Sequence, residues 1–311
     1  MILGGDLGGT KTLLALAEPM DGGLRIVRRQ RYVSGDHADF DSLLADFLHD
    51  APAVTSACFG LAGPTDGHSA RLTYLPWQLA AAAISRRFGI GRVTLSNDFA
   101  AAAHGLPLVA PEEIRSLHPG QTLAGAPRII LGAGTGLGVA GLVPQGDGYR
   151  VVPGEGGHLG FAPQTSVQGE LWCWLHEQTD RVTTEDIVSG PGLARVYRFL
   201  GGPGEPAENI GQAAIAGSDP RATQAVQLWL ACYGAFAGDL ALHWLARGGI
   251  YLAGGMAARL MPHVDCSPFI NAFLDKREHA GLAAEMPVHL VTAEDLGLRG
   301  ALAIAAGGTA D

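Results

Sequence analysis

Residue types that signal several classes of protein are scarce in this sequence of 311 residues. Cysteine occurs four times, at Cys58, Cys173, Cys232 and Cys266. These cysteines are widely spread and form no C-x-x-C pair, which argues against structural zinc or a disulfide framework and fits a reducing compartment. The net charge is -9 and the longest basic cluster is the group of arginines near Arg28 to Arg31, which argues against nucleic acid or an anionic membrane as the main partner.

Long apolar runs are also rare. The N-terminus reaches Asp6 too soon for a signal peptide, so we expect a cytoplasmic location. The most apolar long stretch is Ala225 to Ala246. Polar and small residues interrupt it: Gln227, Gly234, Gly238, Asp239 and His243. The stretch therefore predicts a buried central helix against which other elements pack closely, with a membrane span as the alternative.

Glycine, by contrast, is abundant, with 45 residues in 311, about twice the usual ~7%. Many of these glycines follow apolar runs, so we expect function to lie on loops carried by strands. Hydrophobic residues make up 47% of the sequence, which suits a well-buried globular protein. The length exceeds what one hydrophobic core usually supports and predicts two domains.

Two glycine-rich turns stand between apolar runs. Residues 129–138 read Ile-Ile-Leu-Gly-Ala-Gly-Thr-Gly-Leu-Gly and continue into an apolar run, and residues 4–12 follow the same pattern early in the chain. Each predicts a strand, a tight turn and a second strand. Glycine allows backbone N–H groups to converge on an anion, so each turn is interpreted as a phosphate loop, with a hairpin that binds nothing as the alternative.

Neither turn matches the well-known strand-to-helix phosphate motifs. Thr10 separates the glycines from Lys11, whereas a P-loop has glycine directly before lysine, and G-x-G-x-x-G is absent from both turns. Two copies of one hairpin, one early and one mid-chain, predict two related domains that face each other across a cleft.

Acidic and amide side chains stand near the predicted strand ends. Asp6, in the first turn, would repel a phosphate unless a cation lay between them, so it is a candidate Mg²⁺ ligand through water, or else a turn-forming aspartate. A short predicted strand ends at Asn97-Asp98, where α/β sheets gather ligands. An Asn or Asp before a helix is also a preferred N-cap, and these residues alone favour the cap.

Three further segments contain candidate functional residues. Glu155 and His158, held among glycines, would present two polar groups to one small ligand, or else form a solvated glutamate and a packed histidine. Thr183 with Asp186 is typical of a helix start with Glu185 in its first turn, and residues 189–192 are expected to break that helix. The glycine pair at 254–255 follows a predicted strand and is a candidate nucleoside site.

Taken together, six motifs in order resemble the bacterial ATP-dependent glucokinase family, which is related to the repressor–ORF–kinase (ROK) sugar kinases. These motifs are Asp6-Leu-Gly-Gly-Thr10, Ser96-Asn97-Asp98-Phe99, Gly132-Ala-Gly-Thr-Gly-Leu-Gly138, Pro153-Gly-Glu155-Gly-Gly-His158, Ser189-Gly-Pro-Gly-Leu193 and Leu252-Ala-Gly-Gly255. The resemblance implies an α/β, two-domain actin-like ATPase (ribonuclease H-like) fold with a cleft between the domains. The expected small domain is 1–107 plus 296–311, and the expected large domain is 108–295.

The resemblance also implies roles for particular residues. Asp98 is the expected general base for the sugar 6-hydroxyl. The expected ligands of the other sugar hydroxyls are Asn97, Glu155, His158 and Glu185. The expected ATP-binding residues are Asp6, Gly8, Gly9, Thr10, Lys11, Gly134, Thr135, Gly136, Gly254 and Gly255, with Asp6 associated with Mg²⁺. A homodimer is implied as well.

The resemblance predicts transfer of the γ-phosphate of ATP to the 6-hydroxyl of glucose. One departure bears on the sugar: Tyr74 occupies the position of a family asparagine. The cysteine-rich zinc segment of the ROK branch is absent after His158, which places the chain with the zinc-free glucokinases. The alternatives are a kinase for another hexose or amino sugar, a kinase that uses polyphosphate, and a sugar-binding regulator without catalysis.

Overall fold

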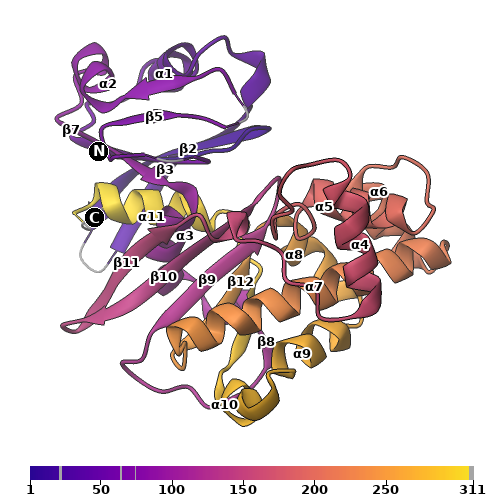
Figure 1. Cartoon of the computed structure of the whole chain (residues 1–311). Helices are drawn as coiled ribbons and strands as arrows, with labels where there is room; N and C mark the ends of the chain where they lie inside the picture. Colours follow the sequence, from indigo (N-terminus) through magenta and orange to yellow (C-terminus); the bar gives the residue numbers. More distant parts are fainter. Residues whose placement is uncertain (21–22, 64, 74, 308–311) are drawn as a thin grey trace. The chain divides into compact units, whose positions relative to one another are not determined.

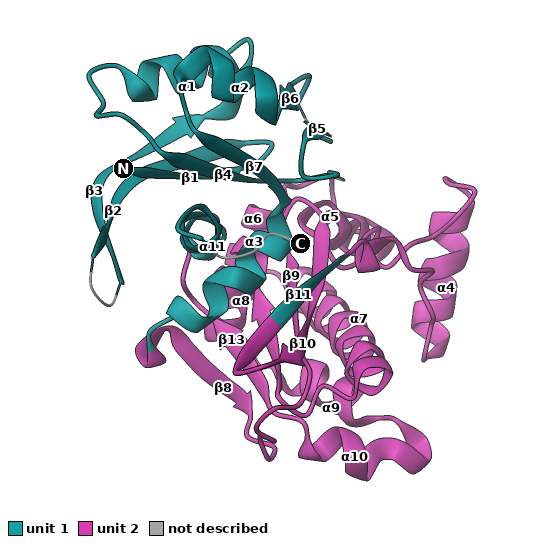
Figure 2. Cartoon of the chain, turned by 90° about the vertical axis from the view of Figure 1, so that its left-hand side faces the viewer, with its two compact units in different colours: residues 1–110, 150–153, 295–311 teal, residues 111–149, 154–294 magenta. Residues whose placement is uncertain are grey.

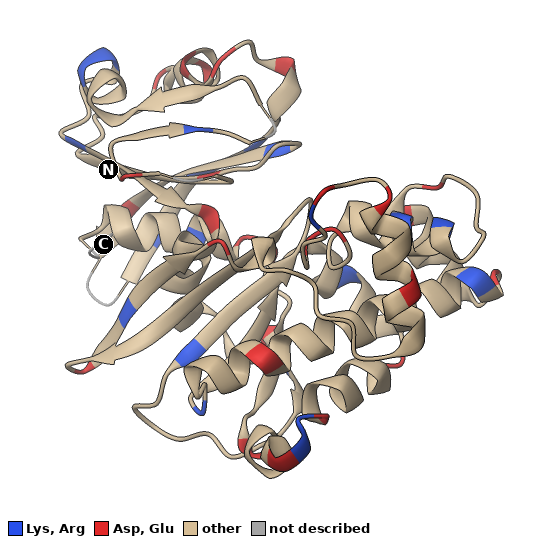
Figure 3. Cartoon of the chain, in the orientation of Figure 1, with Lys and Arg blue, Asp and Glu red and all other residues tan. Residues whose placement is uncertain are grey.

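The computed structural model describes residues 1–20, 23–63, 65–73 and 75–307, in two compact units (Figures 1 and 2). Unit 1 contains residues 1–110, 150–153 and 295–311, and unit 2 contains residues 111–149 and 154–294. Tyr74, which occupies the position of a family asparagine, lies outside the described residues. Acidic and basic positions are interspersed along both units (Figure 3).

Unit 1 is built on a five-stranded sheet in the order β3-β2-β1-β4-β7. β1 is antiparallel to β2 and parallel to β4, which is parallel to β7. Because successive side chains of a strand point to opposite faces, Leu3 and Leu7 of β1 pack into one core and Ile2 into another. The strands are β1 (Ile2–Leu7), β2 (Lys11–Met20), β3 (Gly23–Val33), β4 (Ser56–Leu61) and β7 (Arg92–Asn97), with a separate pair β5 (Ser69–Arg71) and β6 (Gln78–Ala80).

Helices cover both faces of this sheet (Figure 1). Residues of α1 and α2 complete the core that contains Leu3, and residues of α3 and α11 complete the core that contains Ile2. α1 begins after Asp39, whose side chain accepts the N–H of Ser42. The helices are α1 (Phe40–Leu48), α2 (Ala81–Phe88), α3 (Asp98–Gly105) and α11 (Leu296–Ala305), with short 3-10 turns at Ser34–Asp36 and Leu106–Leu108.

Unit 2 contains most of a six-stranded sheet in the order β11-β10-β9-β12-β13-β8, of which residues 150–153 in β11 are grouped with unit 1. β9, β12 and β13 are parallel to one another, whereas β10 and β8 are antiparallel to their neighbours β9 and β13. The strands are β8 (Ile114–His118), β9 (Arg128–Ala133), β10 (Leu137–Gln145), β11 (Gly148–Gly154), β12 (Gly249–Ala253) and β13 (Val288–Val291). The helices are α4 (Ser166–His176), α5 (Gly190–Phe199), α6 (Ala207–Ala216), α7 (Pro220–Trp244), α8 (Gly255–Leu260), α9 (Ser267–Leu274) and α10 (Ala280–Glu285), with 3-10 turns at Pro111–Glu113, Gly156–His158, Met261–His263 and Arg277–His279.

The long helix α7 supplies much of the core of unit 2. Trp229 and Tyr233 are fully buried in it. A Cβ placed on Gly234 would lie 2.0 Å from the carbonyl oxygen of Phe269 in α9, so the two helix backbones are in contact there. α7 is long and apolar enough to span a membrane, but 72% of its most apolar window is buried inside the protein. The prediction of a buried central helix is confirmed.

Both glycine-rich turns connect antiparallel strands, as predicted. β1 and β2 pair from Ile2 opposite Ala17 to Leu7 opposite Thr12. β9 and β10 pair from Arg128 opposite Leu142 to Ala133 opposite Leu137. We call residues 8–11 the first phosphate hairpin and residues 134–137 the second, after the role that the sequence predicts for them.

Candidate functional site

In unit 1, the parallel strands bring the predicted residues to one edge of the sheet. Leu7 of β1 is in register with Leu61 of β4, which is in register with Asn97 of β7. All three strands therefore end at the same edge, with about 4.8 Å between neighbouring strands. Asp6 and Asn97 lie in the last residues of their strands at this edge, and the first phosphate hairpin and Asp98 come directly after it. We call these residues the unit 1 group.

The first phosphate hairpin is held by a serine that sequence reasoning missed. The N–H of Gly8 donates to the Lys11 carbonyl at 2.9 Å and closes the turn. The buried Ser34 donates its hydroxyl to the Gly8 carbonyl at 2.8 Å and lies 3.0 Å from the Thr12 hydroxyl. The Ser34 N–H also donates to the Thr10 carbonyl at 3.1 Å. One residue thus fixes both sides of the turn. Ser34 directly follows an arginine-rich strand, and nothing in that local sequence predicts a contact with the turn.

Asp6 lies at the carboxyl end of β1 against the start of α11. A Cβ on Gly297 would lie 3.1 Å from the carboxyl carbon of Asp6, so a larger residue there would press on the Asp6 side chain. Burial raises the pKa of Asp6, Lys11 lowers it, and Asp295 raises it. Asp295 is itself paired with Arg29 at 2.9 Å and with Arg299 at 2.8 Å. Asp6 therefore stands two residues before the hairpin with its pKa raised above the usual value of a carboxyl group.

Asn97 and Asp98 occupy the junction of β7 and α3. The side-chain oxygen of Asn97 accepts the N–H groups of Phe99 at 2.9 Å and Ala100 at 3.1 Å, so the N-cap interpretation is correct. The cap does not exclude a ligand role, because it orients the Asn97 amide and leaves its NH₂ for another acceptor. Asp98 is the first residue of α3, is partly exposed, and accepts the Phe99 N–H at 2.8 Å.

In unit 2, the second phosphate hairpin lies beside the glycine pair after β12. The N–H of Gly134 donates to the Gly136 carbonyl at 2.8 Å, and Thr135 at the tip is exposed. β12 runs parallel to β9, with Ala253 opposite Gly132. Gly254 has a φ of +88°, and a Cβ there would lie 2.7 Å from the Ala133 carbonyl oxygen, so the position requires glycine. The structure thus brings these two predicted parts of an ATP site together.

The loop that carries Glu155 and His158 packs against the strand that leaves this hairpin. A Cβ on Gly157 would lie 2.2 Å from the Leu137 carbonyl oxygen, and the His158 N–H donates to the Glu155 carbonyl at 3.1 Å. Both Glu155 and His158 are exposed. The predicted sugar ligands of unit 2 therefore stand next to the predicted phosphate ligands, on a backbone that allows no side chain at residue 157.

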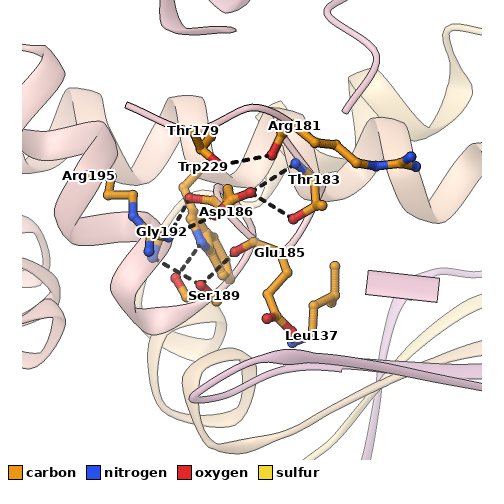
Figure 4. A network of polar contacts seen from close by, with 10 residues as sticks. All are labelled: Leu137, Thr179, Arg181, Thr183, Glu185, Asp186, Ser189, Gly192, Arg195 and Trp229. Atoms are coloured by element: carbon orange, nitrogen blue, oxygen red, sulfur yellow. Dashed lines mark hydrogen bonds and ion pairs between the residues drawn. The ribbon is translucent and has the colours of Figure 1, made fainter. Parts of the chain in front are cut away.

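Residues 183–190 form a turn, and the prediction that a helix starts at Thr183 is wrong (Figure 4). Asp186 does accept the N–H of Thr183 at 2.9 Å and its hydroxyl at 2.8 Å, as in a capping box, but the bonds close an isolated turn. The helix α5 begins at Gly190 instead, with Ser189 as its N-cap. The expected break is present at Ser189, which is extended, but residues 190–192 belong to α5, because proline is accommodated in a first turn.

Glu185 makes the contact in this turn that reaches the hairpin. One carboxylate oxygen, Oε2, accepts the N–H of Leu137 at 2.7 Å (Figure 4). The Glu185 N–H donates to the Gly157 carbonyl at 2.9 Å. Glu185, the loop at 155–158, the second hairpin and Gly254-Gly255 therefore form one connected set, which we call the unit 2 group.

The described residues contain no cluster of three or more His, Cys, Asp or Glu side chains arranged to hold a metal ion. The donor set around Asp6, one carboxylate beside a phosphate hairpin, instead suits Mg²⁺, which keeps several waters and takes its other ligands from substrate phosphates.

Comparison with known proteins places this arrangement among sugar kinases. The model of the family described as Glucokinase matches residues 3–307. A glucokinase of Nostoc sp. is 37% identical over 98% of this chain and 99% of its own length. The crystal structure of a glucokinase from an Antarctic psychrotroph is 28% identical, with a TM-score of 0.84 over 98% of both chains. A ROK family glucokinase from Streptomyces griseus, crystallised with glucose and AMPPNP, shares the fold at 20% identity, with a TM-score of 0.70 over 99% of both chains.

Proposed function

The chain belongs to the glucokinase family, and we propose its mechanism on that basis. It accordingly catalyses the ATP-dependent phosphorylation of glucose to glucose 6-phosphate, on an actin-like ATPase fold. The observation that carries this conclusion is the match of the family over residues 3–307, which includes every residue of the unit 1 and unit 2 groups. The assignment of individual residues is our proposal.

In this proposal Asp98 is the general base. The 6-hydroxyl oxygen of glucose attacks the γ-phosphorus of ATP while its proton passes to the Asp98 carboxylate. An oxygen–phosphorus bond forms, the bond from the γ-phosphorus to the β,γ-bridging oxygen breaks, and ADP leaves with that electron pair. Support comes from the position of Asp98, at the partly exposed start of α3 and beside an Asn97 whose orientation is fixed by the cap.

The other polar residues bind the sugar hydroxyls. Asn97 offers its NH₂ group, and the exposed side chains of Glu155 and His158 and the partly exposed carboxylate of Glu185 supply further acceptors and donors. A site that pairs each hydroxyl discriminates strongly, because a sugar without one hydroxyl leaves a buried polar group unpaired.

The two phosphate hairpins bind ATP in this proposal. The turns Gly8, Gly9, Thr10 and Lys11 and Gly134, Thr135 and Gly136 face the phosphates with backbone N–H groups other than those of Gly8 and Gly134, which close the turns. Gly254-Gly255 lie under the adenosine. Asp6 would hold Mg²⁺ through water, and the bound ion would neutralise charge on the phosphates. The narrow turns support this role, since each is closed by a backbone hydrogen bond that fixes its shape.

The family resemblance also leads us to propose that the chain is a cytoplasmic homodimer. Four free cysteines among the described residues agree with a reducing compartment. Light scattering of the purified chain tests the dimer directly, and a monomer at working concentration would contradict it.

An ADP-release assay across a panel of hexoses and amino sugars tests the function. We expect the highest kcat/KM with glucose and ATP. Because polyphosphate releases no ADP, that donor is tested by the formation of glucose 6-phosphate, and we expect no product from it. Faster turnover of another hexose or an amino sugar would identify a different sugar kinase. Glucose binding without turnover of any sugar would favour a regulator. The panel also resolves the question raised by Tyr74, because a loose sugar site would flatten the preference among hexoses.

A further inference from the structure

Glu185 makes a contact that a role as a sugar ligand does not require. Its Oε2 accepts the N–H of Leu137 at 2.7 Å, and Leu137 follows Gly136 at the end of the second phosphate hairpin (Figure 4). The length indicates a strong, charge-assisted hydrogen bond. Leu137 is buried, so without Glu185 its N–H would lose a partner that water does not readily replace.

The turn that carries Glu185 supports the hairpin from both ends. Besides the bond to Leu137, the N–H of Gly190 donates to the Gly134 carbonyl at 2.8 Å. These two bonds hold the first and last residues of the hairpin, 134 and 137. The Ser189 hydroxyl donates to the Glu185 carbonyl at 2.7 Å, which fixes the turn itself.

The same turn also holds the loop of the predicted sugar ligands. The N–H of Glu185 donates to the Gly157 carbonyl at 2.9 Å, and the N–H of Thr184 donates to the Leu159 carbonyl at 2.9 Å. Glu185 thus joins the loop at 155–158 through its backbone and the hairpin at 134–137 through its side chain.

We propose that Glu185 is a positioning residue for the nucleotide: its carboxylate holds the second phosphate hairpin in the shape that binds ATP. The second carboxylate oxygen, Oε1, has no partner among the bonds described for Glu185 and is the atom that meets a sugar hydroxyl. The sugar half of this statement rests on the proposed function. One side chain then serves the sites of both substrates.

Three substitutions separate the two roles of Glu185. In Glu185→Ala both contacts are lost. In Glu185→Gln the amide oxygen still accepts the Leu137 N–H, while the group offered to the sugar changes from an acceptor to a donor. In Glu185→Asp the charge remains, but the shorter side chain no longer reaches Leu137. Glu155→Ala is the control, because Glu155 belongs to the sugar loop and makes no contact with the hairpin through its side chain among the described bonds.

The measurement is the Kd of a non-hydrolysable ATP analogue with Mg²⁺, taken by calorimetry in the absence of sugar, together with the KM for glucose. We expect Glu185→Ala and Glu185→Asp to weaken analogue binding about tenfold, and Glu185→Gln to stay within about threefold of wild type. The KM for glucose rises in all three. Glu155→Ala raises the KM for glucose and leaves the Kd of the analogue unchanged.

The outcomes distinguish this inference from the proposed function. An unchanged Kd for the analogue in Glu185→Ala or, if that variant does not fold, in Glu185→Asp would overturn the positioning role, even with normal turnover of glucose by the wild type. Equal weakening in Glu185→Gln and Glu185→Ala would overturn it as well, because the hairpin bond survives in the first. A wild type that binds the analogue without phosphorylating glucose would overturn the proposed function and leave the comparison of Kd values intact.

Discussion

At the scale of single residues, each phosphate hairpin depends on one side chain from elsewhere in the chain. Ser34 bonds to both sides of the first hairpin, and Glu185 bonds to the end of the second. A glycine-rich turn has few side-chain contacts of its own and gains freedom in the unfolded chain, so it needs an outside partner to hold one shape. A buried hydroxyl group holds the first hairpin, and a carboxylate group holds the second.

Replacing Ser34 by alanine tests the first of these supports. Ser34→Ala removes the donor to Gly8 and leaves the buried Thr12 hydroxyl without its partner, so we expect a loss of about 1–3 kcal/mol in the free energy of unfolding. The KM for ATP should rise about fivefold, since the loosened turn must be ordered by the nucleotide.

The matched control is Ser42→Ala on the surface of α1, where the hydroxyl donates to the Asp39 carbonyl in exposed surroundings. Urea unfolding and the ATP dependence of the rate at saturating glucose are the two measurements. If Ser34→Ala kept the KM for ATP of the control, Ser34 would be a structural residue without a part in nucleotide binding.

These supports could not be predicted from the sequence, whereas the residues that they support could. The turns at Gly8 to Lys11 and Gly134 to Gly136 can be predicted, because glycines between two apolar runs indicate a tight turn between two strands. Ser34 and the Leu137 N–H acquire their roles only through contacts across 26 and 48 residues of sequence, and no local pattern marks them.

At the scale of elements, the turn at 183–190 shows how a local pattern misleads. The spacing of Thr183 and Asp186 predicts a capping box, and its hydrogen bonds are present. No helix follows, because Ser189 is extended and Pro191 has no N–H with which to continue a helix from residue 187. The N–H groups of Thr184 and Glu185 donate to the carbonyls of residues 159 and 157, and the side chain of Glu185 lies against the second hairpin.

Close packing of α7 against α9 is a second feature of this scale. Gly234 and Gly238 lie one helical turn apart, and a Cβ on them would lie 2.0 Å from the Phe269 carbonyl oxygen and 2.6 Å from the Phe273 carbonyl oxygen. Lys276, only 5% exposed, bonds to Asp239 at 2.9 Å and to the Ala235 carbonyl at 3.1 Å at the same interface. The glycines noted in the sequence therefore mark a helix–helix contact.

A pair of glycine-to-alanine substitutions tests this packing. Gly234→Ala should destabilise the protein by about 1–3 kcal/mol or more, because the methyl group would overlap backbone atoms of α9 and force the helices apart. Gly169→Ala in α4, where nothing lies within 4 Å of the added Cβ, should stabilise it by up to about 1 kcal/mol through helix propensity. Chemical unfolding of both variants measures the difference, and a neutral or stabilising Gly234→Ala would show that α9 can move away freely.

At the scale of the whole molecule, the sequence predicted the fold class and the function because the motifs occur in family order along the chain. In both sheets a glycine-rich turn joins two neighbouring antiparallel strands, so each apolar run followed by glycines in the sequence corresponds to a strand and a turn in the structure. The identity of the sugar is less accessible, since it depends on side chains from distant segments, and on Tyr74, which lies outside the described residues.

The central claim is that Asp98 accepts the proton when glucose is phosphorylated by ATP, and Asp98→Asn tests it most directly. Asparagine keeps an oxygen to accept the Phe99 N–H, so the start of α3 should be preserved. The account predicts that the rate of glucose 6-phosphate formation at saturating substrates falls by about 10²–10⁴-fold, while the Kd for glucose stays within about threefold of wild type. Turnover by Asp98→Asn close to that of the wild type would contradict the account.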